Sequence, residues 1–144
     1  MYKENKWIDY IPNMSDRPIN YLEIGLNESD NLISIGNTYA KHPESKLFAI
    51  NLFMNDDEFN NKTLMEFYDN SMDIIYIADN KDAKTTLENI VLSFVKLKEN
   101  GYLIVDNYHN ILEINMMVDT ICYKDCYKFL GHKQNQFFIQ KIKK

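Results

Sequence analysis

The chain of 144 residues has only two cysteines, four glycines and three prolines, and it lacks any long apolar run. Cys122 and Cys126 stand four residues apart in a predicted helix, where adjacent turns give poor disulfide geometry and two ligands alone do not complete a zinc site. We therefore expect both thiols to be reduced. No stretch approaches the length of a membrane span, and the first ten residues lack the apolar centre of a signal peptide. These absences predict an intracellular, soluble (cytoplasmic) protein without a membrane partner.

Basic residues are in the minority, since 16 lysines and arginines stand against 21 aspartates and glutamates, for a net charge of −5. A phosphate backbone would on average be repelled, so we expect no nucleic-acid partner. Residues 1–144, with 45% hydrophobic and 26% charged residues, have the composition of a single globular domain. The abundance of Asn, Ile and Lys, with Arg17 as the only arginine, indicates an AT-rich genome.

Several catalytic signatures are also missing. The sequence has no Walker or Rossmann glycine fingerprint, and no arrangement of Ser, Cys and His that would support nucleophilic catalysis. It has no internal repeat, low-complexity tract or linker. The chain is therefore predicted to fold as one unit.

Strand and helix patterns alternate along the chain. Strands are predicted at 19–24, 47–50, 73–78 and 102–105, helices at 30–41, within 60–68, from 82 to 100 and at 111–122, and a closing antiparallel pair at 127–130 and 136–142. The run DIIYIA at 73–78 has no polar alternation, which is typical of a parallel strand buried on both faces. The helix that follows it carries its apolar residues on one stripe, and Gly101 is its expected C-terminal stop.

This order predicts an α/β fold, a three-layer α/β/α Rossmann-like sandwich with a mostly parallel sheet and a C-terminal antiparallel hairpin. Residues 1–18 form a lead-in segment whose aromatic and aliphatic side chains we expect to pack on the core. Ligands of such sheets bind beyond the carboxyl ends of the strands. The residues in that position are Glu23 to Ser29, Asn51, Asp79 and Asp106 to Tyr108.

The segments YLEIG, IYIAD and KLKENGYLIVDNY resemble the first, fourth and fifth strands, with their trailing motifs, of class I S-adenosylmethionine-dependent methyltransferases. The resemblance extends from about Ile19 to Tyr108 and more loosely to the C-terminal hairpin. It implies S-adenosylmethionine as the cofactor. The residues that it assigns to cofactor binding are Glu23, Gly25, Ser29, Asn51 and Asp79.

The sequence departs from the family pattern at several of the positions that would bind the cofactor. Ser29 stands where the family usually has a second glycine, and the next residue, Asp30, would accept the free N–H groups of the helix start and repel the cofactor's carboxylate. Asn51 replaces the acid that accepts both ribose hydroxyls, a loss of about 1–3 kcal/mol. Only twenty-one residues separate Asn51 from Asp73, so we expect the family's third strand to be missing and the adenine side to be open.

Asp79, Asp106 and Asn107 match the three metal ligands of the metal-dependent small O-methyltransferases residue by residue. Two carboxylates and an amide oxygen suit Mg²⁺, which in that family polarises the substrate hydroxyl. Acids after parallel strands also cap helices, and Asp-Asn is a common turn pair, so turn or cap duty is the alternative for all three.

Residues for proton transfer are fewer. The family's usual lysine base, three residues after its first metal ligand, is replaced here by Asp82, with Lys81 and Lys84 beside it. His109 would stand at the mouth of the crevice and is the catalytic candidate that remains, with plain solvent exposure as its alternative.

The leading hypothesis is a degenerate methyltransferase-like domain, a pseudoenzyme with weak or lost S-adenosylmethionine binding that serves as a binding or structural module. Its partner would be an unknown protein or a second copy, the latter pairing through an exposed sheet edge. The alternative is an active small O-methyltransferase that uses S-adenosylmethionine and Mg²⁺.

Overall fold

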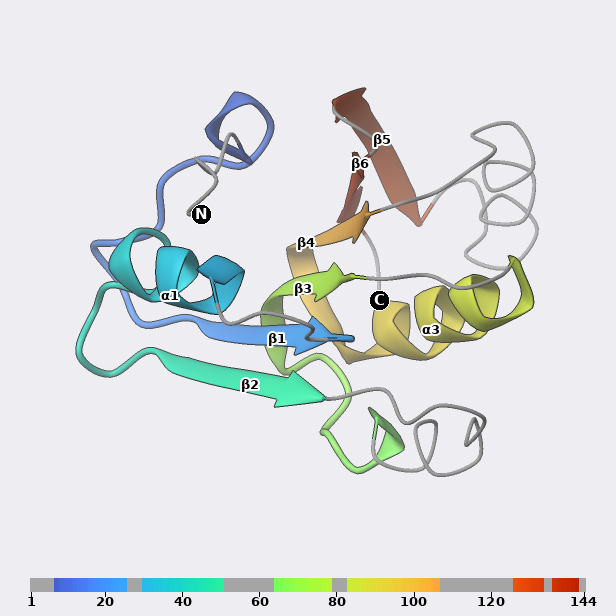
Figure 1. Cartoon of the computed structure of the whole chain (residues 1–144), viewed down its shortest axis with the longest axis horizontal. Coiled ribbons are helices and arrows are strands. Elements are labelled where there is room, and N and C mark those ends of the chain that lie inside the picture. Colours follow the sequence, from blue (N-terminus) through green and yellow to red (C-terminus); the bar gives the residue numbers. More distant parts are fainter. Residues whose placement is uncertain are drawn as a thin grey trace.

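The computed structural model describes residues 7–25, 30–50, 64–78, 83–106, 126–133 and 136–142. In these ranges six strands form one sheet, in the order β2-β1-β3-β4-β6-β5 (Figure 1). The strands are β1 (Asn20–Ile24), β2 (Lys46–Ile50), β3 (Met72–Ile77), β4 (Leu97–Asp106), β5 (Tyr127–Lys133) and β6 (Gln136–Lys141). Strands β1 to β4 pair in parallel, and β6 runs antiparallel to both of its neighbours. The predicted mostly parallel sheet and C-terminal hairpin are confirmed.

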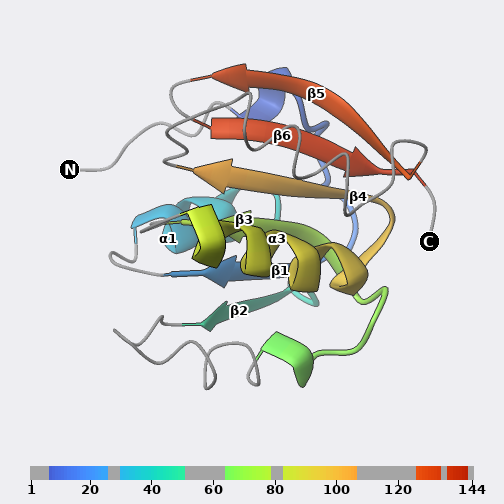
Figure 2. The same ribbon diagram turned by 90° about the vertical axis from the view of Figure 1, so that its right-hand side faces the viewer.

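Helices cover both faces of this sheet. Helix α1 (Asp30–Asn37) and the short 3-10 helix η1 (Trp7–Asp9) lie on one face, and α3 (Ala83–Lys96) lies on the other (Figure 2). Because successive residues of a strand point to opposite faces, each central strand contributes to two separate cores. Strand β3 is buried along its whole length, as its unbroken apolar run predicted. The fold is thus a three-layer sandwich.

The two cores differ in chemistry. The α3 side is mainly aliphatic, with Ile75 and Leu103 from the sheet in the same cluster as Phe94 of the helix. The α1 side is rich in aromatic residues, and tyrosines from β1, β3 and β4 are buried there beneath α1 and the N-terminal segment. Polar side-chain atoms are therefore present inside the α1 side, and they need partners.

One boundary prediction was wrong. Gly101 does not end the helix before it, because α3 ends at Lys96 and β4 begins at once with Leu97, which pairs with Met72. Gly101 lies within β4, where a Cβ atom would come within 2.9 Å of the Lys98 carbonyl and 3.1 Å of the Met72 carbonyl. The glycine is required by the close approach of the neighbouring backbone. Its signal resembles a helix stop because both situations exclude a side chain.

Other boundaries shift by a few residues. Helix α1 ends at Asn37, short of the predicted Lys41, and the chain then turns with a hydrogen bond from Ala40 N to Ile35 O of 2.8 Å. The predicted helix at 111–122, with Cys122, lies outside the described residues. Within the described ranges no helix is both long and apolar enough to cross a membrane.

The N-terminal lead-in packs against the C-terminal hairpin. Tyr10 stacks on Phe138 with ring centroids 4.5 Å apart, and its hydroxyl donates to His132 O at 3.2 Å. Asp9 forms an ion pair with Lys133. The aromatic packing predicted for this segment is confirmed for Trp7, whose side chain is buried, and these contacts tie the two ends of the chain together across the sheet.

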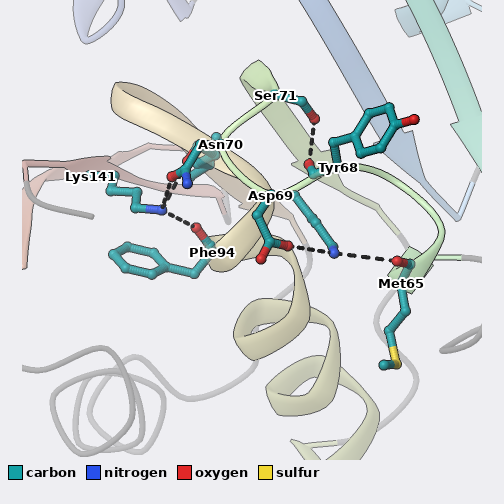
Figure 3. A network of polar contacts seen from close by, with 9 residues as sticks. Met65, Tyr68, Asp69, Asn70, Ser71, Phe94 and Lys141 are labelled. Atoms are coloured by element: carbon teal, nitrogen blue, oxygen red, sulfur yellow. Dashed lines mark hydrogen bonds and ion pairs between the residues drawn. The ribbon is translucent and has the colours of Figure 1, made fainter.

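A buried lysine fixes the opposite, amino end of the sheet (Figure 3). The ammonium of Lys141, in a residue only 3% exposed, donates to Phe94 O at 3.0 Å, to Leu97 O at 2.9 Å and to Asn70 Oδ1 at 3.2 Å. It also lies 5.1 Å from the centre of the Phe94 ring. A cation at the last carbonyls of a helix is favourable, so Lys141 caps α3 from β6.

Replacing Lys141 with Met should destabilise the protein strongly. The substitution keeps the length of the side chain but leaves the buried carbonyls of Phe94 and Leu97 without this donor, at about 1–3 kcal/mol for each acceptor. Urea unfolding of Lys141→Met measures the loss. The matched control is Lys128→Met on the exposed side of β5, which should change stability by less than about 0.5 kcal/mol. Equal effects of the two substitutions would refute the capping role.

Candidate functional site

The carboxyl ends of the central strands bring four polar side chains to one edge of the sheet. Glu23 of β1 is the register partner of Tyr76 of β3, and Asp106 at the end of β4 is the partner of Gln136 at the start of β6. All four lie on the α1 side, because register partners and residues two apart share a face. Gly25 follows β1 with φ of 85°, a left-handed conformation that favours glycine.

Glu23 is enclosed by the protein's own donors. The residue is 2% exposed, and its Oε1 accepts hydrogen bonds from the Tyr21 hydroxyl at 2.7 Å and from Asn31 Nδ2 at 2.7 Å. The Asn31 amide also reaches the Tyr21 oxygen at 3.1 Å. Because Asn31 lies in the first turn of α1, this triad joins the end of β1 to the start of the helix.

Burial determines the protonation of the tyrosine in this triad. Loss of solvent raises the pKa of Tyr21 well above its usual value, and the neighbouring Glu23 carboxylate raises it further. The hydroxyl therefore remains a donor at neutral pH. Glu23 thus has a permanent internal partner in Tyr21 and a second one in Asn31.

Asp106 is held in a similar way. Its Oδ2 accepts a short hydrogen bond from the Tyr76 hydroxyl and another, at 3.2 Å, from Gln136 Nε2. The Gln136 carbonyl oxygen in turn accepts the indole N–H of Trp7 at 3.1 Å, and the Trp7 ring meets Tyr76 edge-on at a centroid distance of 5.2 Å. Burial, followed by the Asp106 charge, raises the pKa of Tyr76. A chain of polar contacts therefore runs from β3 through Asp106 to the N-terminal segment.

Three residues of the predicted site lie within the described ranges. Glu23, Gly25 and Asp106 occupy the carboxyl ends of their strands. The predicted residues that lie outside the described ranges are Ser29, Asn51, Asp79, Asn107 and His109. The ligand-binding and catalytic roles assigned to all of these residues, and the side-chain role assigned to Asp30, stay predictions.

Both Mg²⁺ and the amine of the methyl donor would compete with hydrogen-bond donors that the protein itself supplies. A cation that took Oδ2 of Asp106 would displace two hydrogen-bond donors, which disfavours that oxygen as a ligand. Within the described ranges, no cluster of three His, Cys, Asp or Glu side chains could hold a metal. An amine of the methyl donor that reached Glu23 Oε1 would compete with Tyr21 and Asn31 in the same manner.

Sequence reasoning missed the donors that hold these carboxylates: Trp7, Tyr21, Asn31, Tyr76 and Gln136. A usable signal was present for two of them. Tyr21 and Tyr76 are the only aromatic residues of β1 and β3. Tyr21 stands two residues from Glu23 and so on the same face, which could have suggested a buried pair.

No protein-family model matches this chain, and no curated protein matches it.

Solved structures show the fold. A release factor-specific protein-(glutamine-N5) methyltransferase from Alicyclobacillus acidocaldarius has a TM-score of 0.66 at 12% identity, covering 94% of this chain and 86% of that one. A SAM-dependent methyltransferase from Archaeoglobus fulgidus has a TM-score of 0.63 at 10% identity, covering 94% and 91% of the two chains. The fold of the chain is therefore that of S-adenosylmethionine-dependent methyltransferases, as the motifs predicted.

A third similar structure contains a metal. The methyltransferase MycE of the mycinamycin biosynthetic pathway, in complex with Mg, SAH and mycinamycin VI, has a TM-score of 0.70 at 13% identity. The alignment covers 95% of this chain but 48% of MycE, so this chain corresponds to about half of that protein.

Changing Gln136 to Leu should loosen the N-terminal segment. The substitution removes the acceptor of the Trp7 indole N–H and one donor to Asp106, at about 1–3 kcal/mol. Trp7 is the only tryptophan of the chain, so acrylamide quenching of its fluorescence reports this site alone, and quenching should increase. Gln140→Leu, on the same strand, is the matched control and should leave quenching unchanged. Unchanged quenching in Gln136→Leu would contradict the polar chain drawn from Asp106 to Trp7.

The buried tyrosines also predict a fall in stability in alkali. Because burial raises the pKa of Tyr21 and of Tyr39 in the folded state, their contribution is complete below the unfolded pKa of about 10. It is lost as the pH rises toward the folded value. The free energy of unfolding should therefore drop by about 1.4 kcal/mol per pH unit for each such tyrosine above about pH 10.

Urea unfolding across this pH range measures the slope, with tyrosinate absorbance recorded in parallel. Tyr39→Phe removes one of the buried tyrosines and should give a shallower slope. A slope that is the same in the parent and in Tyr39→Phe would show that Tyr39 titrates alike in the folded and unfolded states.

Proposed function

We propose that this chain is a methyltransferase-fold domain with weak or lost S-adenosylmethionine binding, used as a binding or structural module. One observation carries the proposal: both acids of the predicted site that are described, Glu23 and Asp106, have their carboxylates hydrogen-bonded by the protein's own side chains. Carboxylates that already have internal donors gain less from a ligand, because the ligand must first displace those donors.

The sequence also supports weak cofactor binding, at positions other than Glu23 and Asp106. Ser29, Asp30 and Asn51 each replace a residue that favours the cofactor in the family, and the connection after Asn51 is short. If each of these four changes costs about 1–2 kcal/mol, together they weaken micromolar binding to millimolar or worse. The domain would then act through its surface, by binding a protein partner or a second copy of itself.

A second candidate is a small O-methyltransferase that uses Mg²⁺. It is favoured by the position of Asp106 at the carboxyl end of β4 and by the likeness to MycE, which was solved with Mg and SAH. Asp79, Asp106 and Asn107 would hold the ion, whose chemistry is to polarise a substrate hydroxyl. In that case Asp106 would have to bind through an oxygen that Tyr76 and Gln136 leave accessible.

Calorimetric titration with S-adenosylmethionine and with S-adenosylhomocysteine, with and without Mg²⁺, decides between the two functions. The proposal predicts dissociation constants of about a millimolar or weaker and no rise in the melting temperature at low ligand concentration. Low-micromolar binding would overturn it.

The metal is tested separately. Under the second candidate, Asp106→Asn should lose Mg²⁺ affinity and methyltransferase activity together. Under the proposed function this variant should bind Mg²⁺ as weakly as the parent and differ from it only in stability, because a carboxamide accepts the Tyr76 hydrogen bond less strongly than a carboxylate.

A further inference from the structure

We propose that Asn31 is the residue that closes Glu23 to a ligand, and that its carboxamide occupies the place of a ligand's ammonium group. The inference rests on the proposed function and names the contact responsible for the loss of binding. It is carried by the hydrogen bond of 2.7 Å between Asn31 Nδ2 and Glu23 Oε1.

The first step of the argument concerns charge. Glu23 is almost fully buried, and the two groups that donate to its Oε1 are a phenol and a carboxamide, both neutral. A cation at hydrogen-bond distance from a buried carboxylate adds a Coulombic attraction that a neutral donor does not supply. An ammonium group that could reach this oxygen would therefore be a better partner than Asn31.

The second step concerns access. Asn31 is the second residue of α1 and is half-buried, whereas Tyr21 and Glu23 are buried. Asn31 is therefore the donor of the two that a ligand from solvent could replace. Shortening Asn31 to alanine removes this donor and a volume of the size of an amide group beside Glu23 Oε1.

The third step concerns the remaining donor. Tyr21 donates to Glu23 from the same strand, and its raised pKa keeps the hydroxyl protonated. Without Asn31, the Glu23 carboxylate would keep the hydrogen bond from Tyr21 but would lack its second donor. Such a site selects a ligand with an ammonium group, such as the amino-acid end of S-adenosylhomocysteine.

The experiment is a gain of binding. Asn31→Ala should bind S-adenosylhomocysteine at least about tenfold more tightly than the parent in calorimetric titration. It should bind 5′-methylthioadenosine, which lacks the ammonium group, no better than the parent. Adding Glu23→Gln to Asn31→Ala should abolish the gain, because a neutral carboxamide then replaces the negatively charged carboxylate.

The control is Asn37→Ala, the same substitution at an exposed position at the other end of α1, which should leave binding unchanged. Asn31→Ser also removes the carboxamide and is measured in parallel, so that the test does not depend on the folding of one variant. A folded Asn31 variant that binds S-adenosylhomocysteine no more tightly than the parent overturns the inference and leaves the proposed function standing. Tight binding by the parent itself overturns the proposed function instead.

Discussion

A buried carboxylate must have hydrogen-bond donors, and in this protein that requirement organises the end of the sheet where a ligand would bind. Glu23 satisfies it with Tyr21 from its own strand and Asn31 from the following helix. The hydrogen bond from Asn31 to this carboxylate also connects the first turn of α1 to β1. A residue that serves the fold in this way is less available to a cofactor, and the function that we propose follows from this competition.

The need of a carboxylate for hydrogen-bond donors also applies to Asp106, at the end of β4. Asp106 is held by Tyr76 and Gln136, and Gln136 extends the contacts to Trp7, far away in sequence. The N-terminal segment is thus linked both to the hairpin and to the end of β4. At the opposite end of the sheet the buried cation of Lys141 donates from β6 to carbonyls at the end of α3.

The fold could be predicted because its signals are periodic and redundant. The unbroken apolar run of β3 and the paired strands of the hairpin each indicate one arrangement. Gly101 was misread because a glycine that avoids a neighbouring backbone looks the same in sequence as a helix stop. The site was harder to predict. Glu23 and Asp106 could be located at the carboxyl ends of their strands, but their hydrogen-bond donors depend on the register between strands and on the first turn of α1. A single sequence does not contain that information.

The most direct measurement is a crystal structure of the protein soaked in millimolar S-adenosylhomocysteine. Our account predicts that Glu23 Oε1 still accepts its hydrogen bonds from Tyr21 and Asn31 and that no ordered nucleoside lies above Gly25. A fully occupied ligand beside Gly25, with Asn31 turned away and the ligand's amine bonded to Glu23, would contradict it.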